Sequence, residues 1–277
     1  MGALLDLAAS SSSLWLDYGD YAGRLLAGGQ VPWSDVSAYV AWQRKAQGLL
    51  KSDVIALPLA PLSEAWLAAH PGLREAMAGK RRAVFPIKTL LADEALRTHI
   101  AELLSGLRAS FARQPLALVL PSPRAWIALA YRQAHGPQDD ATSDADDVDS
   151  AAMYVADFLR SFGDCGIDAL LLQETAGAEP TDAAELEWYR PVFNVCAHYR
   201  WDCGLHLPAA AHAPGAVEGL GFVVAPQRLD IGQSVVALDE AFWTGAEPPP
   251  ATAGLRFAVV PAGASPEAVL DRLAVLR

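Results

Sequence analysis

Short apolar runs alternate with longer amphipathic stretches along most of this 277-residue chain. The short runs are nearly continuous in Val, Ile, Leu and Ala, a pattern typical of parallel strands that are buried on both faces. They predict eight strands, over residues 54–60, 83–88, 116–120, 168–173, 201–207, 221–225, 234–238 and 255–261. The longer stretches repeat apolar residues at helical spacing and predict helices over residues 63–78, 93–113, 148–162, 181–199 and 265–276.

Eight strands with helices between most of them predict an α/β fold, a single (β/α)8 TIM-type barrel over residues 51–277. The strand spacing narrows after residue 200, so we expect the late helices to be shortened. Residues 1–50 precede the first predicted strand and are expected to form an N-terminal helical extension, with helices at 16–27 and 34–50. A doubly wound open sheet is the alternative, but the Gly-rich phosphate loop that it needs after an early strand is missing from the sequence.

Charge and composition narrow the classes of partner. The formal net charge of −11 argues against a nucleic-acid partner, which would need a basic face. No apolar stretch is long enough to span a membrane, and the first residues lack the basic start and apolar core of a signal peptide. Three cysteines in a chain of this length are no disulfide framework. These features predict a soluble, cytoplasmic protein that binds a small molecule.

An acidic segment breaks the alternating pattern. Residues 138–150 hold six aspartates and no basic residue. A run of like charges is usually a solvated loop, and the ligand order and central glycine of an EF-hand are absent. We therefore expect a loop here rather than a cation site.

Candidate catalytic residues lie where the predicted strands end, because the functional face of a parallel barrel is at the C-terminal ends of its strands. Glu174 directly follows a strongly apolar strand, where burial would raise its pKa toward general acid or base duty. A structural ion pair with an arginine is the alternative role for Glu174. Asp202 and His206, in the fifth predicted strand, complete the candidate catalytic set.

Candidate substrate-binding residues lie at the same predicted opening. Lys88, Arg124 and Arg228 follow the second, third and sixth predicted strands and would clamp an anionic substrate. Gln173 ends the fourth predicted strand and is expected to contact the substrate as well. Together these residues predict a small anionic organic ligand.

A zinc site at Cys203 and His206 is a further hypothesis, because thiolate and imidazole are both zinc ligands. Residues three apart in an extended segment face opposite sides, so both can bind one metal only if the chain turns at Gly204. A buried cysteine is more commonly a small core residue. We therefore assign no metal ligand and no cofactor.

Two segments carry a family resemblance. LALVLPSPRAWIALAY at residues 116–131 and DDVDSAAMYVADFLRSFGDCGIDALLLQE at residues 146–174 resemble the middle of the uroporphyrinogen decarboxylase / cobalamin-independent methionine synthase superfamily. The resemblance covers roughly residues 50–210 and rests on pattern more than on rare residues. It implies a barrel, often dimeric, that performs methyl transfer or decarboxylation.

The chain also departs from that superfamily. Methionine-synthase-type members bind zinc with a His-x-Cys pair, whereas here Cys203 precedes His206 and no later cysteine follows. The arginine-rich N-terminal segment of the decarboxylases is absent. We expect a divergent barrel enzyme that performs methyl (one-carbon) transfer on a small anionic molecule. A metal-free decarboxylase and a non-catalytic binding or accessory barrel are the alternatives.

Overall fold

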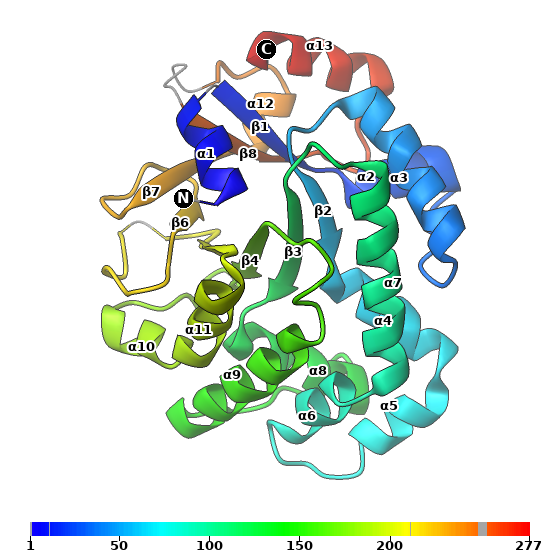
Figure 1. Ribbon diagram of the computed structural model, residues 1–277, viewed down its shortest axis with the longest axis vertical. Coiled ribbons are helices and arrows are strands. Elements are labelled where there is room, and N and C mark those ends of the chain that lie inside the picture. The colour runs from blue at the N-terminus through cyan, green and yellow to red at the C-terminus, as the bar shows by residue number, and fades with distance from the viewer. Residues whose placement is uncertain (1, 11, 211, 249–253) are drawn as a thin grey trace.

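The computed structural model describes residues 2–10, 12–210, 212–248 and 254–277 (Figure 1). Its strands form one 8-stranded parallel sheet in the order β1-β8-β7-β6-β5-β4-β3-β2. The sheet curls into a nearly closed barrel with helices between the strands, which confirms the predicted (β/α)8 fold. The strands are β1 (Ser12–Asp17), β2 (Ile55–Pro58), β3 (Leu116–Pro121), β4 (Ala169–Gln173), β5 (Asp202–His206), β6 (Phe222–Ala225), β7 (Gln233–Leu238) and β8 (Gly254–Val259).

The helices are longest in the first two thirds of the chain. They are α1 (Ala3–Ser10), α2 (Gly19–Ala27), α3 (Val36–Leu50), α4 (Leu59–Ala69), α5 (Pro71–Met77), α6 (Phe85–Leu91), α7 (Glu94–Ser110), α8 (Pro123–His135), α9 (Ala145–Arg160), α10 (Ala183–Glu187), α11 (Arg190–Tyr199), α12 (Glu240–Trp243) and α13 (Pro266–Leu276). Where the structure describes the chain between β5 and β7, it contains no helix, in keeping with the compressed strand spacing there. No helix within the described residues has the length and apolar character needed to cross a membrane.

The N-terminal part of the chain differs most from the expectation. Residues 1–50, predicted to be a helical extension, include β1, which pairs with β8 inside the barrel. The strand predicted over residues 83–88 is wrong, because these residues lead into and form part of helix α6. Pro86 lies in the first turn of α6, and Ile87, Leu90 and Leu91 are buried at helical spacing.

The acidic segment is only partly a loop. Helix α9 begins at Ala145, so the last aspartates of residues 138–150 lie in its first turns. The side chain of Asp144 accepts a hydrogen bond from the backbone N–H of Asp147, and Asp146 and Asp147 follow in the first turn. Negative charge at a helix N-terminus is stabilised by the helix dipole, which explains why this stretch is helical despite its charge.

Side chains on the strands alternate between two apolar layers. Those that point outward pack against the surrounding helices, and those that point inward fill the barrel. The interior contains the rings of Trp15, Phe222 and Phe257, with Trp15 edge-on to Phe257 at a centroid distance of 5.7 Å. Gly204 makes room for Phe222, because a Cβ at this position would overlap the Phe222 ring. The Phe222 ring therefore fits inside the barrel because residue 204 has no side chain.

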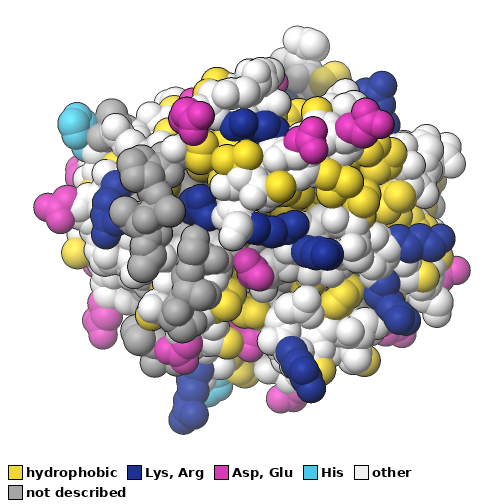
Figure 2. Space-filling view, turned by 90° about the horizontal axis from the view of Figure 1, so that it is seen from above, with side chains coloured by type: hydrophobic (Ala, Val, Ile, Leu, Met, Phe, Trp, Pro, Cys, Tyr) yellow, Lys and Arg dark blue, Asp and Glu magenta, His cyan; other side chains and the backbone are white. Residues whose placement is uncertain are grey.

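Helix α1 closes the N-terminal end of the barrel. Its Leu4 and Ala8 pack on the interior apolar cluster. On the face turned toward the viewer in Figure 2, basic and acidic side chains are interspersed with apolar ones. The net charge of −11 is thus not gathered on that face.

Strands β1 and β2 meet at a seam that has no regular ladder within the described residues. Side chains connect the two strands instead: Leu14 donates its N–H to Asp53 Oδ2 at 2.8 Å, and Leu16 donates to Ser52 Oγ at 3.0 Å. One backbone bond, from Asp53 N–H to the Leu14 carbonyl at 2.9 Å, adds to them. Closure of the barrel thus depends on Ser52 and Asp53, which precede β2.

We predict that Ser52→Ala destabilises the protein by about 1–3 kcal/mol, because it leaves the buried N–H of Leu16 without its acceptor. Urea denaturation followed by circular dichroism measures the change. Ser110→Ala, at an exposed position at the end of α7, is the matched control and should alter the free energy of unfolding by less than about 0.5 kcal/mol. Equal stability of the two variants would contradict the role of Ser52 in the seam.

Candidate functional site at the C-terminal end of the barrel

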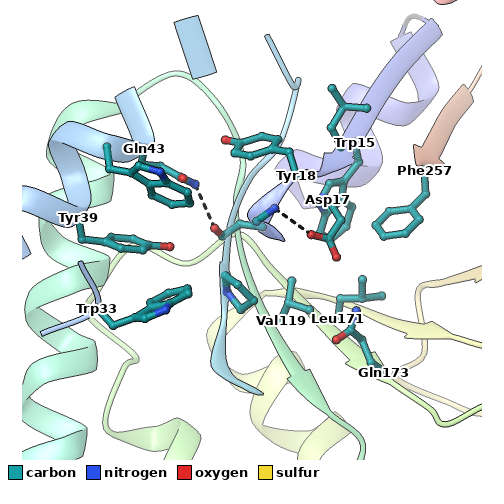
Figure 3. A pocket seen from close by; sticks show the side chains of 15 residues that line it. Trp15, Asp17, Tyr18, Trp33, Tyr39, Gln43, Val119, Leu171, Gln173 and Phe257 are labelled. Carbon is teal, nitrogen blue, oxygen red and sulfur yellow. Dashed lines mark hydrogen bonds between the residues drawn. The ribbon is translucent and has the colours of Figure 1, made fainter. Parts of the chain in front are cut away.

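A cavity lies at the C-terminal end of the barrel, where the seam between β1 and β2 opens (Figure 3). Its floor is apolar and comes from inward-pointing residues of the barrel, including Trp15, Val119 and Phe257. The cavity has a volume of about 30 Å³, which is room for about two water molecules. It is therefore a small, mostly apolar space beneath the mouth of the barrel.

Asp17, the last residue of β1, supplies the carboxylate of this cavity. Burial raises the pKa of Asp17, and the nearby charge of Asp20 raises it further, whereas a backbone hydrogen bond lowers it. That hydrogen bond comes from the N–H of Gly19 to Asp17 Oδ1 and is long, at 3.4 Å. Asp17 is thus a partly buried carboxylate whose negative charge is stabilised by only one long hydrogen bond within the described residues.

Aromatic rings from α3 and the turn before it form the opposite wall. Trp33 and Tyr39 are stacked with centroids 5.0 Å apart, and Trp42 lies 5.4 Å from Tyr39. Figure 3 shows Trp33 and Tyr39 on one side of the cavity and Asp17 on the other. Trp42 is fixed by a hydrogen bond from its Nε1 to the carbonyl of Ala22 at 3.3 Å.

Gln43 adds a buried acceptor to the same wall. Its side chain is 2% exposed, and its Nε2 donates to the carbonyl of Ala56 in β2 at 3.3 Å. This bond fixes which end of the amide is nitrogen, so the other end is the oxygen. Gln43 Oε1 is buried and accepts no hydrogen bond from the described residues.

A wider groove of about 780 Å³ continues from the cavity to the surface. The two spaces share Asp17, Trp33 and Gln173 in their linings. Arg24 is the basic residue among those that line the groove, and Asp20 and Glu64 line it as well. Asp17 therefore stands where a solvent-open groove meets a smaller cavity.

Gln173 and His206, both predicted site residues, lie side by side at the ends of β4 and β5, where they are register partners. The His206 ring lies over Phe257 at 5.2 Å and borders a second groove of about 390 Å³, together with Asp239 and Glu240. Burial lowers the pKa of His206 to about 4, and the charge of Glu179 opposes this shift. His206 is thus a neutral imidazole at ordinary pH.

Glu174 points away from the barrel interior, into a polar cluster behind the mouth. Ser122 donates to its Oε2 at 2.8 Å and Tyr189 donates to its Oε1 at 2.6 Å. Burial raises the pKa of Glu174 to about 7, although these two hydrogen bonds and Arg124 lower it. Glu174 lines neither the cavity nor the two grooves described above, so it supports the end of β4 from outside.

The predicted cation clamp is not assembled. Arg124, at the start of α8, binds the Ala178 carbonyl and Glu185, each at 3.2 Å. Lys88 is exposed on α6, with its Nζ 5.5 Å from the centre of the Tyr154 ring, because the residues around it are helical rather than a strand end. Arg228 is exposed in the connection between β6 and β7. None of the three cations lines the cavity or the two grooves described above.

Asp202 lies at the opposite end of the barrel from His206. Its carboxylate accepts hydrogen bonds from the N–H groups of Gly2, Leu4 and Leu5 at 3.0–3.1 Å and so caps α1. Burial raises the pKa of Asp202, and the three N–H donors lower it. Its neighbours identify it as a structural residue that attaches α1 to the barrel.

The cysteine and histidine considered for zinc point in different directions. Cys203 belongs to the outward apolar layer and contacts Cys196 of α11, whereas His206 faces the interior. The described residues contain no group of three or more His, Cys, Asp or Glu side chains that could hold a metal ion. The donor set at Cys203 and His206 therefore does not suit zinc.

Sequence reasoning missed Asp17 and Gln43, and only Asp17 had a clear signal. Asp17 ends the run SSLWLD, in which apolar residues precede a carboxylate in the same way as they precede Glu174. The run is short and Ser-rich, and it lies within the predicted helical extension. Gln43 carried no signal beyond being a polar residue on the apolar face of a predicted helix.

We predict that ionisation of Glu174 makes stability depend on pH. Its pKa in the folded chain, about 7, exceeds the ordinary value of 4.5, so folding stability is greatest at low pH and falls as the pH rises from 4.5 to 7. Relative to Glu174→Gln, the free energy of unfolding of the wild type should fall by about 2–3 kcal/mol between pH 5 and pH 8. Urea titrations at several pH values measure this difference.

The control for this prediction is Glu102→Gln on the exposed face of α7, which should give a constant difference from the wild type. Parallel pH curves for the wild type and Glu174→Gln would show that Glu174 is ionised with an ordinary pKa in the folded chain.

The comparisons with known proteins add no relative to this description. No protein-family model and no curated protein sequence matches the chain. The superfamily resemblance noted in the sequence therefore stays a prediction, and the functional proposal depends on the site itself.

Proposed function

We propose that this protein is a barrel enzyme that performs methyl (one-carbon) transfer on a small organic molecule bound at the C-terminal end of the barrel. The observation that carries the proposal is the position of Asp17, a partly buried carboxylate at the junction of the cavity and the wider groove. Active sites of (β/α)8 barrels lie at this end. The sequence resemblance supports the choice of methyl transfer.

Asp17 acts as the general base in this proposal. Burial makes its carboxylate more basic than an exposed aspartate, so it accepts a proton more readily from a bound nucleophile. The nucleophile loses its proton to Asp17, and its lone pair forms the bond to the methyl carbon. The bond from that carbon to the methyl donor breaks, and its electron pair leaves with the donor, a compound with an activated methyl group.

Other groups at the mouth position the substrate. Gln173 lies between the cavity and the groove and offers both a donor and an acceptor. The neutral imidazole of His206, on the adjacent strand, contacts ligand in the second groove. Glu174 has a positioning role, because Ser122 and Tyr189 occupy both of its oxygens.

The charges at the mouth do not favour the anionic substrate expected from the sequence. The charged lining of the main groove is Arg24 against Asp17, Asp20 and Glu64. Zinc-assisted activation of a thiol is not part of the proposal either, because the donor set does not suit it. The proposed reaction needs Asp17 and a methyl donor.

We predict that Asp17→Asn lowers kcat/KM by about 100-fold or more, because the amide cannot accept the proton. A library of small nucleophiles, incubated with methyl donors of several classes, is followed by mass spectrometry for the gain of a methyl group. Asp149→Asn, which removes the same charge at an exposed position on α9, is the control and should keep full activity.

Each other result of this screen identifies a different function. Full methyl transfer by Asp17→Asn would contradict the role of Asp17. Release of CO2 without methyl transfer would assign the protein to the decarboxylases. Saturable ligand binding without any product would favour the non-catalytic binding protein.

A further inference from the structure

The charge of the small cavity distinguishes among ligand classes. Among the described residues that line it, Asp17 is the one acidic group, and none is Lys, Arg or His. An anionic group placed there would lie beside a carboxylate with no cation to compensate it. The cavity therefore selects against anions.

The hydrogen-bonding groups of the cavity make the same selection more specific. Asp17 receives one long hydrogen bond from Gly19, and the buried Gln43 Oε1 receives none from the described residues. The Nε2 of Gln43 is already committed to the Ala56 carbonyl. The cavity thus presents one acceptor that lacks a donor and one carboxylate with a single long hydrogen bond, and an apolar ligand would leave Gln43 Oε1 unpaired at a cost of about 1–3 kcal/mol. A ligand that supplies N–H donors removes this cost.

The walls suit a positively charged nitrogen. Trp33 and Tyr39 present aromatic rings on the side of the cavity opposite Asp17, and Trp42, next to Tyr39, lines the cavity as well. Aromatic faces attract cations, most strongly where water is excluded. The volume of about 30 Å³ accommodates a group the size of an ammonium with one methyl or methylene. The charge, the hydrogen-bonding groups, the aromatic walls and the size of the cavity all indicate a small ammonium group.

We infer that the substrate of this site is a small primary or secondary amine, bound as its ammonium ion between Asp17 and Gln43. The inference rests on the proposed function, in which Asp17 takes a proton from the nucleophile. It adds the chemical class of that nucleophile: the ammonium donates one N–H to Asp17, and the proton passes to the carboxylate. The free amine then holds the lone pair that attacks the methyl carbon, and the rest of the molecule extends into the groove past Gln173.

Calorimetric titration of the full chain with methylammonium chloride tests the inference. We expect saturable binding, with no binding of sodium acetate at equal ionic strength. Asp17→Asn should weaken the binding of methylammonium at least about 10-fold, because it removes the charge and keeps the shape. Asp149→Asn is the control for the loss of one negative charge and should bind as the wild type does.

A second variant keeps the test decisive if Asp17→Asn does not fold. Gln43→Met retains the length of the side chain and removes the acceptor, so it should weaken methylammonium binding several-fold. Its folding is checked by circular dichroism. Absence of saturable binding to the wild type, or equal affinity in the wild type and a folded variant, would overturn the inference.

The results also separate this inference from the proposed reaction. If the enzyme methylates only compounds without an amine, and methylammonium neither binds nor competes with them, the reaction stands and the amine is refuted. If methylammonium binding depends on Asp17 but no compound in the screen is methylated, the ammonium site stands and the proposed reaction is refuted.

Discussion

The way in which the barrel closes determines the rest of the structure. Seven strand pairs are joined by parallel ladders, whereas β1 and β2 are joined mainly through the side chains of Ser52 and Asp53. These side chains occupy acceptor positions that backbone carbonyls fill elsewhere in the sheet. Closure is therefore achieved near the start of β2, and the seam is free to open toward the C-terminal end, where a functional site belongs.

The open part of the seam brings α3 into the site. The carbonyl of Ala56, in β2, bonds to Gln43 of α3 rather than to a neighbouring strand on that side. Trp33, Tyr39 and Trp42 then line the cavity from outside the barrel, while Trp15 and Phe257 line it from inside. Against a continuous sheet, α3 would only cover the outside of the barrel. At the open seam it contributes polar and aromatic groups to the mouth of the barrel.

The sequence predicted the barrel because several of its strands are nearly continuous apolar runs, such as LALVLP in β3, ALLLQ in β4 and FVVA in β6. It did not predict β1, because SSLWLD is short, polar at both ends and paired only with the distant β8. Instead of β1, the sequence pattern predicts a strand at residues 83–88. The buried positions there follow the period of a helix. The pairing of β1 with β8 joins residues that are far apart in the sequence, so a local pattern of apolar residues does not predict it.

The positions of the predicted site residues differ for a related reason. Gln173 and His206 end clear strands, and the structure makes them register partners at the ends of β4 and β5. Asp202 begins its strand rather than ending it, so its carboxylate meets α1 at the other end of the barrel. Glu174 follows β4 by one residue, and the alternation of strand side chains turns it outward. A shift of one position along a strand therefore decides whether a carboxylate points into the barrel mouth or outward toward the surrounding helices.

The contrast between Asp202, Glu174 and Asp17 explains why we assign chemistry to the last. Asp202 has three N–H donors and Glu174 has two hydroxyl donors, so the fold itself satisfies both carboxylates. Asp17 has one long hydrogen bond and lies beside a cavity whose other buried acceptor, Gln43 Oε1, receives none from the described residues. A buried acceptor without a donor, next to a carboxylate with only one long hydrogen bond, lowers stability with no gain for the fold. Such an arrangement is retained where a ligand supplies the missing donors, because sites that bind and react are the places where proteins sacrifice stability for function.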